Sequence, residues 1–282
     1  STARRSTSQN NYFEVISMVI GIDMGASAVK LAALENGEVV LSHYESGRGG
    51  DVPALCSRLG LDLKAARAVT VMGLSARKAG LEATGISPIY VSEPEAIGRG
   101  AMYLTGLDNI VIASIGTGTA FVHAKGGEFK HLCGTGVGAG TLNGLAERML
   151  GVTDMREFDR MAMAGDTNQV DLTIGDFVEM HGQLAANLTA SNLARRNAAA
   201  GENDWAAGLA TLIFQVIGTM SLIACQGCGA ESVVITGAIA GSEPSRANFR
   251  RFTEGYGIEY IVPENSTFAT AIGAALCAGN AG

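Results

Sequence analysis

Charged residues are scarce in this chain of 282 residues. They make up 17% of it, and the excess of acidic over basic side chains gives a net charge of -7. Proteins that bind nucleic acid normally present a basic face to the phosphate backbone, so this balance argues against a nucleic-acid partner. Hydrophobic residues reach 47%. That share excludes a disordered chain and is large enough for a substantial buried core.

Cysteines and uninterrupted apolar runs are also few. Five cysteines are too few for a disulfide scaffold of this length, and free thiols suit a reducing cytoplasm. Cys225 and Cys228 form a lone CxxC pair with no second pair to complete a zinc site, so we expect structural thiols. The most apolar stretch, Leu209 to Cys225, is interrupted by Gln215 and Gly218. It predicts a buried helix, and we expect no membrane partner.

Residues 1–17 are polar and contain no apolar segment of signal-peptide length. Met18 directly precedes the first apolar strand, so we expect a natural start there and a disordered leader before it. The remaining length fits two domains. We place an N-terminal domain at 18–108 and a C-terminal domain at 109–282, the latter with a helical insertion at about 151–205.

Short β-rich segments alternate with longer helical stretches along the chain. The expected strands are 18–23, 29–34, 39–43, 68–72, 89–92, 109–115, 119–124, 129–132, 232–236 and 258–261. The expected helices are 52–59, 94–104, 137–150, 154–164, 174–180, 204–225, 246–253 and 267–278. Each half therefore opens with three strands. This repeat predicts an α/β fold of two actin-like (ribonuclease H-like) domains.

Glycine is abundant, with 38 residues, and two glycine-rich hairpins occupy equivalent places in the two halves. In the first, residues 21–30 (GIDMGASAVK), backbone N–H groups can approach phosphate oxygens closely. Ser27 adds a hydroxyl, Asp23 is placed to hold Mg²⁺ through water, and Lys30 supplies positive charge. The second hairpin, residues 115–119 (IGTGT), follows the same logic. Two such hairpins, one per domain, can clamp a nucleotide, so we expect ATP to be bound in the cleft between the two domains.

Two further glycine-rich segments flank these hairpins. Residues 134–143 (GTGVGAGTLN) lead into an apolar helix, whose N-terminus would favour an anion. This is not a Walker A loop because no Lys-[Ser/Thr] pair closes it. Residues 234–241 (VITGAIAG) run from a strand into a turn where an adenosine could lie.

A carboxylate stands at another strand-to-helix junction. Residues 91–100 (VSEPEAIGRG) place Glu93 at the end of a strand, with Pro94 expected at the first helical position. A kinase needs an acceptor for the proton of the attacking hydroxyl, and Glu93 fits this role. Glu95 is the alternative, and both residues could instead simply complement the helix N-terminus.

At this point the sequence resembles the type II pantothenate kinases over nearly all of residues 18–278. The motifs that carry the resemblance are GIDMGASAVK, SEPEAIGRGAMYL, NIVIASIGTGTAF, GTGVGAGTLNGL, MAMAGDTNQVDL, LTASNL, ITGAIA and FATAIGAAL, in that order. The MAMAGDTNQVDL and LTASNL segments are the most diagnostic, since other kinases of this fold share the glycine loops.

The resemblance implies phosphorylation of pantothenate by ATP and Mg²⁺ as the first step toward coenzyme A. It implies a cytoplasmic homodimer, and it makes coenzyme A or an acyl-CoA a candidate inhibitor. It makes Glu93 the catalytic carboxylate and Asp23 the metal-binding one. The implied nucleotide site consists of Asp23, Gly25, Ala26, Ser27, Lys30, Gly116, Gly118, Gly136, Gly138, Gly140, Thr141 and Gly237. The implied substrate residues are Thr117, Thr119, His131, Gly134, Thr135, Thr189 and Ala190, with residues 188–192 near the partner's substrate.

Three positions depart from the family pattern. Ala26 replaces the second glycine of the first loop, and Leu193 replaces a phenylalanine. His131 stands where the family usually has an arginine that holds the pantothenate carboxylate. An arginine is a permanent bidentate clamp, whereas a histidine is charged only at lower pH. Lys130 should point to the opposite face of its strand.

Three other readings stay open on the sequence. A sugar or amino-sugar kinase of the same superfamily would carry similar loops. An iron–sulfur activator of dehydratases would share the fold and could use Cys133. A nucleotide-binding sensor without turnover would need no carboxylate clamp.

Overall fold

The computed structural model describes residues 17–47, 50–73, 75–177 and 189–280. Its strands are β1 Met18–Met24, β2 Ala28–Glu35, β3 Glu38–Ser46, β4 Ala68–Met72, β5 Ile89–Tyr90, β6 Ile110–Ile115, β7 Thr119–Lys125, β8 Glu128–Thr135, β9 Leu172–Thr173, β10 Thr189–Ser191, β11 Ser232–Gly237 and β12 Glu259–Ile261. Its α-helices are α1 Val52–Arg58, α2 Glu93–Thr105, α3 Ala139–Leu150, α4 Met155–Ala164, α5 Glu202–Cys228, α6 Glu243–Tyr256 and α7 Ala269–Leu276.

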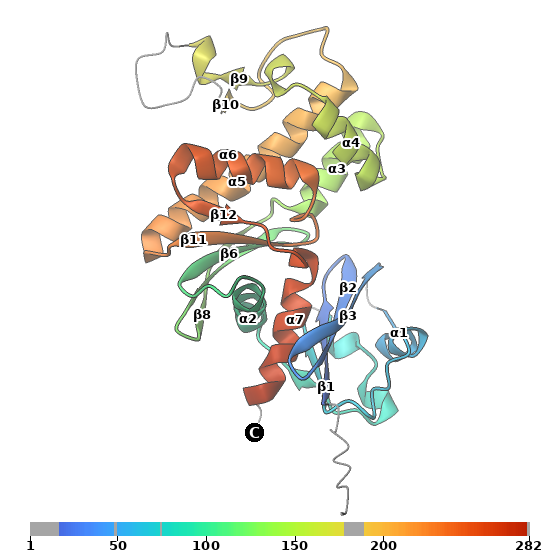
Figure 1. Cartoon of the computed structure of the whole chain (residues 1–282). Helices are drawn as coiled ribbons and strands as arrows, with labels where there is room; N and C mark the ends of the chain where they lie inside the picture. Colours follow the sequence, from blue (N-terminus) through green and yellow to red (C-terminus); the bar gives the residue numbers. More distant parts are fainter. Residues whose placement is uncertain (1–16, 48–49, 74, 178–188, 281–282) are drawn as a thin grey trace, which may run out of the picture.

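Two five-stranded sheets have the same topology (Figure 1). Their strand orders are β3-β2-β1-β4-β5 and β8-β7-β6-β11-β12. In each sheet the first three strands pair antiparallel and the remaining ones parallel. The expected repeat of three opening strands in an α/β fold is thereby confirmed, and each half has its own hydrophobic core.

Local sequence explains the hairpin between β2 and β3. Asn36 and Gly37 have φ values of 50° and 87°, the left-handed conformation that two-residue hairpin turns require. Elsewhere the element bounds differ by a few residues from those predicted. Strand β8 runs on to Thr135 because that residue still pairs with Thr119 on β7. Glu93 occupies the first position of α2, so Pro94 is second rather than first.

The predicted helix at 174–180 is reduced to one 3-10 turn at Ile174–Asp176, and residues 178–180 lie outside the described ranges.

Helix α5 is the central helix of the second half. By length and composition it could cross a membrane, but 61% of its most apolar window is buried inside the protein. Phe214 and Ile217 belong to the core between this helix and the second sheet. Near its end the buried Cys225 thiol donates a hydrogen bond to the carbonyl of Ala230. The prediction of a buried helix at this place is confirmed.

Helices α2 and α7 join the two halves. Helix α7 packs on β1 and β2 of the first sheet, while α2, which precedes the second half in sequence, packs on β6, β7 and β8 (Figure 1). The two helices cross in close contact, because a Cβ on Gly100 would lie 1.8 Å from the carbonyl oxygen of Ala269. The division at residue 108 stays a prediction. The first sheet precedes this residue in sequence and the second sheet follows it. Helix α2 also precedes it but packs on the second sheet, and α7 follows it but packs on the first.

One acidic side chain in the second half is expected to cost stability. Burial, and then the nearby charge of Glu243, raise the pKa of Asp159 to about 6. The folded chain holds a proton that the unfolded chain releases near pH 4, so the free energy of unfolding falls between about pH 4 and 6. We expect Asp159→Asn to raise the free energy of unfolding at pH 7.5 by about 1–2 kcal/mol, allowing for screening.

Urea unfolding at pH 4.5 and 7.5 tests this. The gain should be present at pH 7.5 and shrink at pH 4.5. Glu157→Gln, at an exposed position of the same helix α4, is the matched control and should show no such difference. A gain of equal size at both pH values would contradict the assignment to Asp159.

Candidate active site

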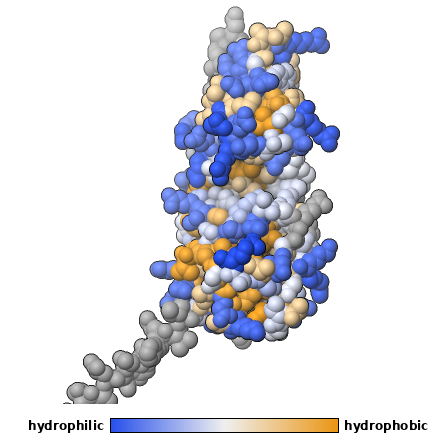
Figure 2. Space-filling model, turned by 90° about the vertical axis from the view of Figure 1, so that its right-hand side faces the viewer, coloured by the Kyte–Doolittle hydropathy of each residue, from blue (hydrophilic) through white to orange (hydrophobic). Residues whose placement is uncertain are grey.

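A cavity of about 700 Å³ opens where the two halves meet, a volume typical of small-molecule sites. The turn between β1 and β2 and the turn between β6 and β7 contribute to its wall, together with the starts of α2, α3 and α7. These elements converge because the carboxyl ends of β1, β4, β6 and β11 meet here. In Figure 2 pale residues of intermediate hydropathy predominate across the middle of the visible face, and both hydrophilic and hydrophobic residues lie above and below them.

Most of the predicted site residues line this cavity. They are Asp23, Gly25, Ala26, Ser27, Lys30, Glu93, Gly116, Thr117, Gly118, Thr119, Gly134, Thr135, Gly136 and Gly140. The sequence therefore identified segments that the fold brings together from four separate parts of the chain.

A buried ion pair lies on the first hairpin. Lys30 Nζ is 3.3 Å from Asp23 Oδ2, and both side chains are 11% exposed. The two residues pair directly across β1 and β2, so their side chains share one face of the sheet. A carboxylate and an ammonium group beside a glycine-rich turn suit a charged ligand, because each of the two groups has an oppositely charged partner before the ligand binds.

The two hairpins touch each other. The hydroxyl oxygens of Ser27 and Thr117 are 2.9 Å apart and form a hydrogen bond between the halves. These hydroxyls belong to residues that the sequence analysis placed against the nucleotide phosphates and the substrate. When a ligand binds between the hairpins, this hydrogen bond can break, and the two hydroxyls can then form hydrogen bonds to oxygens of the ligand.

The glycines of the third segment allow two loops to pack closely. Ala139 N–H donates to the carbonyl of Gly116 at 2.9 Å, and Gly140 N–H donates to that of Thr117 at 3.0 Å. A Cβ on Gly138 would lie 2.6 Å from the carbonyl oxygen of Gly118. Two N–H groups at the start of α3 thus already have partners within the protein. The expected anion site keeps fewer donors than the sequence suggested, and close packing accounts for several glycines.

Geometry separates the two candidate carboxylates. Glu93 lines the cavity. Glu95 accepts a hydrogen bond from Arg99 Nε at 2.9 Å, one turn further along α2, and does not line the cavity. Glu93 is therefore better placed than Glu95 to act on a bound substrate.

Several predicted site residues do not line the cavity within this chain. They are Gly138, Thr141, Gly237, His131, Thr189 and Ala190. Gly237 has a φ of 105° and a Cβ on it would meet the backbone of Ile115, which gives this glycine a packing role. Thr141 donates its hydroxyl to the carbonyl of Gly136. Thr189 lies on β10 and accepts a hydrogen bond from Gln215. Its expected place beside a partner's substrate stays a prediction.

The sequence analysis did not single out some residues that do line the cavity. They are Tyr44, Met72, Gly73, Ser114, Ala120, Ala139, Asn143, Met155, Ala238, Ile239 and Thr270. The available signal was that seven of them lie within motifs already noted, namely Ser114, Ala120, Ala139, Asn143, Ala238, Ile239 and Thr270. Nothing local in the sequence marks Tyr44 on β3 or Met155 at the start of α4.

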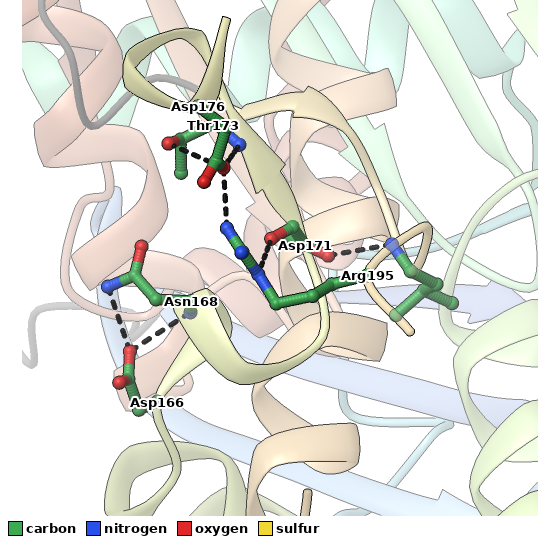
Figure 3. Close-up of polar contacts among 7 residues, drawn as sticks. Asp166, Asn168, Asp171, Thr173, Asp176 and Arg195 are labelled. Atoms are coloured by element: carbon green, nitrogen blue, oxygen red, sulfur yellow. Dashed lines mark hydrogen bonds and ion pairs between the residues drawn. The ribbon is translucent and has the colours of Figure 1, made fainter. Parts of the chain in front are cut away.

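Residues of the two most diagnostic motifs and of the segments that follow them make the polar contacts drawn in Figure 3. Asp171, buried to 1% exposure, accepts a hydrogen bond from the N–H of Leu193 at 2.8 Å. Burial raises the pKa of Asp171, and its hydrogen bonds oppose that shift. Arg195 donates to the Asp171 carbonyl and to Asp176. The network thus fixes residues 189–195 onto residues 166–176, and its members do not line the cavity.

Comparison with known proteins identifies the family of this chain. The family model described as Fumble matches residues 109–253. This chain belongs to the Fumble family of type II pantothenate kinases. A type II pantothenate kinase of Oceanobacillus iheyensis is 28% identical over 91% of this chain and 98% of its own length. One from Staphylococcus epidermidis is 24% identical over 91% and 99%.

Solved structures agree on the fold. Component A of the (R)-2-hydroxyglutaryl-CoA dehydratase of Acidaminococcus fermentans has a TM-score of 0.64 at 19% identity, covering 92% of this chain and 96% of that one. A ROK hexokinase of Thermus thermophilus has a TM-score of 0.53 at 16% identity, covering 92% and 97%. The expected actin-like fold is confirmed, and at these identities the likeness concerns the fold alone.

Proposed function

We propose that this type II pantothenate kinase family member transfers the γ-phosphoryl group of ATP to the primary hydroxyl of pantothenate. The observation that supports the proposal is that Asp23, Lys30, both glycine hairpins and Glu93 line the same cavity. Two relatives that this chain matches over nearly their full length are named type II pantothenate kinases. The site requires no Walker A loop, because two hairpins take its place.

The nucleotide is proposed to lie across the hairpins, with its phosphates between Ser27 and Thr117. Asn143, Met155 and Ile239 line the side of the cavity toward α3, α4 and β11. An apolar shelf with one carboxamide suits a purine base, which presents flat faces and a polar edge. Lys30 is placed to stabilise charge on the transferring group.

The residues present fit a magnesium ion that is held mainly by phosphate oxygens and water. Asp23 is 8% exposed and faces the cavity. Within the described residues no group of three or more His, Cys, Asp or Glu side chains could hold a metal. A single carboxylate is nevertheless sufficient, because Mg²⁺ commonly keeps several waters and uses substrate phosphates. When bound with ATP, the ion would neutralise phosphate charge.

Glu93 is proposed to accept the proton of the acceptor hydroxyl as the hydroxyl oxygen attacks the γ-phosphorus. The bond from phosphorus to the β,γ-bridging oxygen breaks, and ADP leaves. Glu93 meets the positional requirement because it stands at the first position of α2, exposed to the cavity.

Pantothenate-dependent release of ADP tests the function. With ATP and Mg²⁺ present, we expect ADP to form at a rate that rises and saturates with pantothenate, and phosphopantothenate to form in equal amount. ATP binding without this turnover would instead support the sensor reading. Turnover with a hexose but not with pantothenate would support the sugar-kinase reading.

A residue that the sequence analysis did not single out should affect nucleotide binding. We expect Asn143→Ala to raise the KM for ATP about 5- to 20-fold with little change in kcat, since it would remove one hydrogen bond to the bound nucleotide. Steady-state kinetics at saturating acceptor measures this. Glu147→Ala, one turn further along α3 and not lining the cavity, is the control. An unchanged KM for ATP in Asn143→Ala would sink the proposed placement of the base.

A further inference from the structure

A second cavity lies in the C-terminal half, between α4, α5 and α6, which pack on one another (Figure 1). Its volume of about 240 Å³ has room for about eight water molecules. Ala162 on α4 and Ala210 on α5 belong to its apolar walls, and residues 165–168 of the MAMAGDTNQVDL motif line one side. The proposed kinase function does not use this cavity. Its size suits a small metabolite rather than a nucleotide.

Two buried polar side chains present free oxygens to this cavity. Thr211 is 2% exposed and Asn248 is 7% exposed, and both line the cavity. The Asn248 amide donates to the carbonyl of Pro244 at 2.9 Å, and among the described residues neither its Oδ1 nor the Thr211 hydroxyl has a hydrogen-bond partner. The described polar atoms that are fully enclosed without a partner are the hydroxyls of Thr236 and Ser245. The free oxygens of Thr211 and Asn248 are therefore open to the cavity, where a ligand hydroxyl can donate to one and accept from the other.

Arg251 is the cation among the described residues that line this cavity. It is exposed, and within the described part of the chain it forms no ion pair or hydrogen bond. Because it follows Asn248 by three residues on α6, the two side chains are neighbours, with Cβ atoms about 5–6 Å apart.

Asp166 limits the charge of a ligand in this cavity. It lines the cavity, and hydrogen bonds from Gln169 and Asn168 hold the pKa of its carboxyl below the usual value. The carboxylate stays ionised and disfavours a dianion such as phosphate. Arg251 can then pair with the single charge of a carboxylate.

We propose that this second cavity binds a small hydroxy monocarboxylate. Its carboxylate pairs with Arg251, its hydroxyl bonds to Thr211 and Asn248, and its short carbon chain packs on the alanines of α4 and α5. The site is separate from the active-site cavity, since no described residue lines both.

Helices α4 and α6 connect the two cavities. Met155, the first residue of α4, lines the active-site cavity, whereas Ala162 and Met163 near the end of α4 line the second. Ile239, shortly before α6, lines the active-site cavity, and α6 itself lines the second. A ligand that shifts these helices changes nucleotide affinity, and the nucleotide changes the ligand's affinity by the same factor. This coupling rests on the proposed placement of the nucleotide, whereas the second site does not.

Ligand-observed NMR titration of 3-hydroxybutanoate into the full chain measures binding without turnover. We expect saturable binding, with butanoate, which lacks the hydroxyl, about fivefold weaker. The neutral 3-hydroxybutanamide should bind about tenfold more weakly than the acid. Arg251→Gln should weaken binding of the acid about tenfold, and Thr211→Val about fivefold. Arg250→Gln, at an exposed position of α6 that does not line the cavity, is the matched control and should leave the affinity unchanged.

The absence of saturable binding below about 50 mM, or equal affinities for the acid and the amide, would overturn the proposed site. Equal losses in Arg250→Gln and Arg251→Gln would also overturn it, because they would show unspecific attraction by a basic surface. Repeating the titration with a non-hydrolysable ATP analogue bound should change the affinity for 3-hydroxybutanoate about fivefold or more. An unchanged affinity would refute the coupling through α4 and α6. None of these measurements requires phosphorylation of pantothenate, so the second site and the proposed kinase function can fail independently.

Discussion

Replacing Glu93 by glutamine is expected to lower kcat about 10²- to 10⁴-fold, the range that general-base catalysis contributes. The amide has nearly the shape of the carboxylate but cannot accept the hydroxyl proton. Glu93 is exposed at the first position of α2, so the fold should tolerate the change. Nucleotide binding should persist, because Asp23 and Lys30 belong to the first sheet. Steady-state kinetics and calorimetric titration with ATP measure the two effects.

Glu95→Gln is the matched control for this experiment. It changes the same residue type two positions along α2 and removes an ion pair with Arg99 in which the two side chains are 26% and 34% exposed. Such a pair contributes less than about 1 kcal/mol, and kcat should stay within about threefold of the parent. If Glu93→Gln keeps more than one-tenth of the parent kcat, Glu93 is not the base.

Replacing Gly273 by alanine is expected to lower the free energy of unfolding by about 3 kcal/mol. A Cβ there would lie 1.8 Å from the carbonyl oxygen of Ala96 and 2.6 Å from the nitrogen of Gly100. Both are backbone atoms, so α2 and α7 must move apart, and overpacking of this kind is costly. Catalytic activity should fall as well, since the same helices carry Glu93 and Thr270 into the cavity.

Gly227→Ala in α5 separates this effect from helix propensity. Nothing lies within 4 Å of a Cβ at Gly227, so the substitution should stabilise the protein by about 0.5–1 kcal/mol. Urea unfolding of both variants and the parent gives the comparison. If Gly273→Ala is as stable as the parent, the close crossing of α2 and α7 is not what holds the halves together.

Local features of the sequence were sufficient to predict most elements. Strand β4 matches its predicted bounds, and the Asn36–Gly37 turn has the backbone conformation that its residues favour. The two glycine-rich turns, which line the cavity, were recognisable because their small residues are next to one another in sequence. Glu93 was found because it follows a strand and begins a helix. Each of these signals resides within about ten residues.

Residues that reach the site from elsewhere could not be predicted in this way. Tyr44 and Met155 line the cavity because of how β3 and α4 pack, and no pattern near them marks this. The sequence likewise left Glu93 and Glu95 as alternatives, and the structure separates them because Glu93 lines the cavity while Glu95 pairs with Arg99. It also suggested free N–H donors at the start of α3, whereas Gly116 and Thr117 use two of them.

The sequence by itself determined the α/β alternation, the duplicated strands and the segments that carry the chemistry, because periodicity and turn chemistry are local properties. The tertiary structure alone decided that α2 packs on the second sheet and α7 on the first, and that Glu93 rather than Glu95 lines the cavity. Those outcomes depend on contacts between residues far apart in the chain. Gly100 and Ala269, for example, meet across 169 positions of sequence only because two glycine-containing helices can approach backbone to backbone.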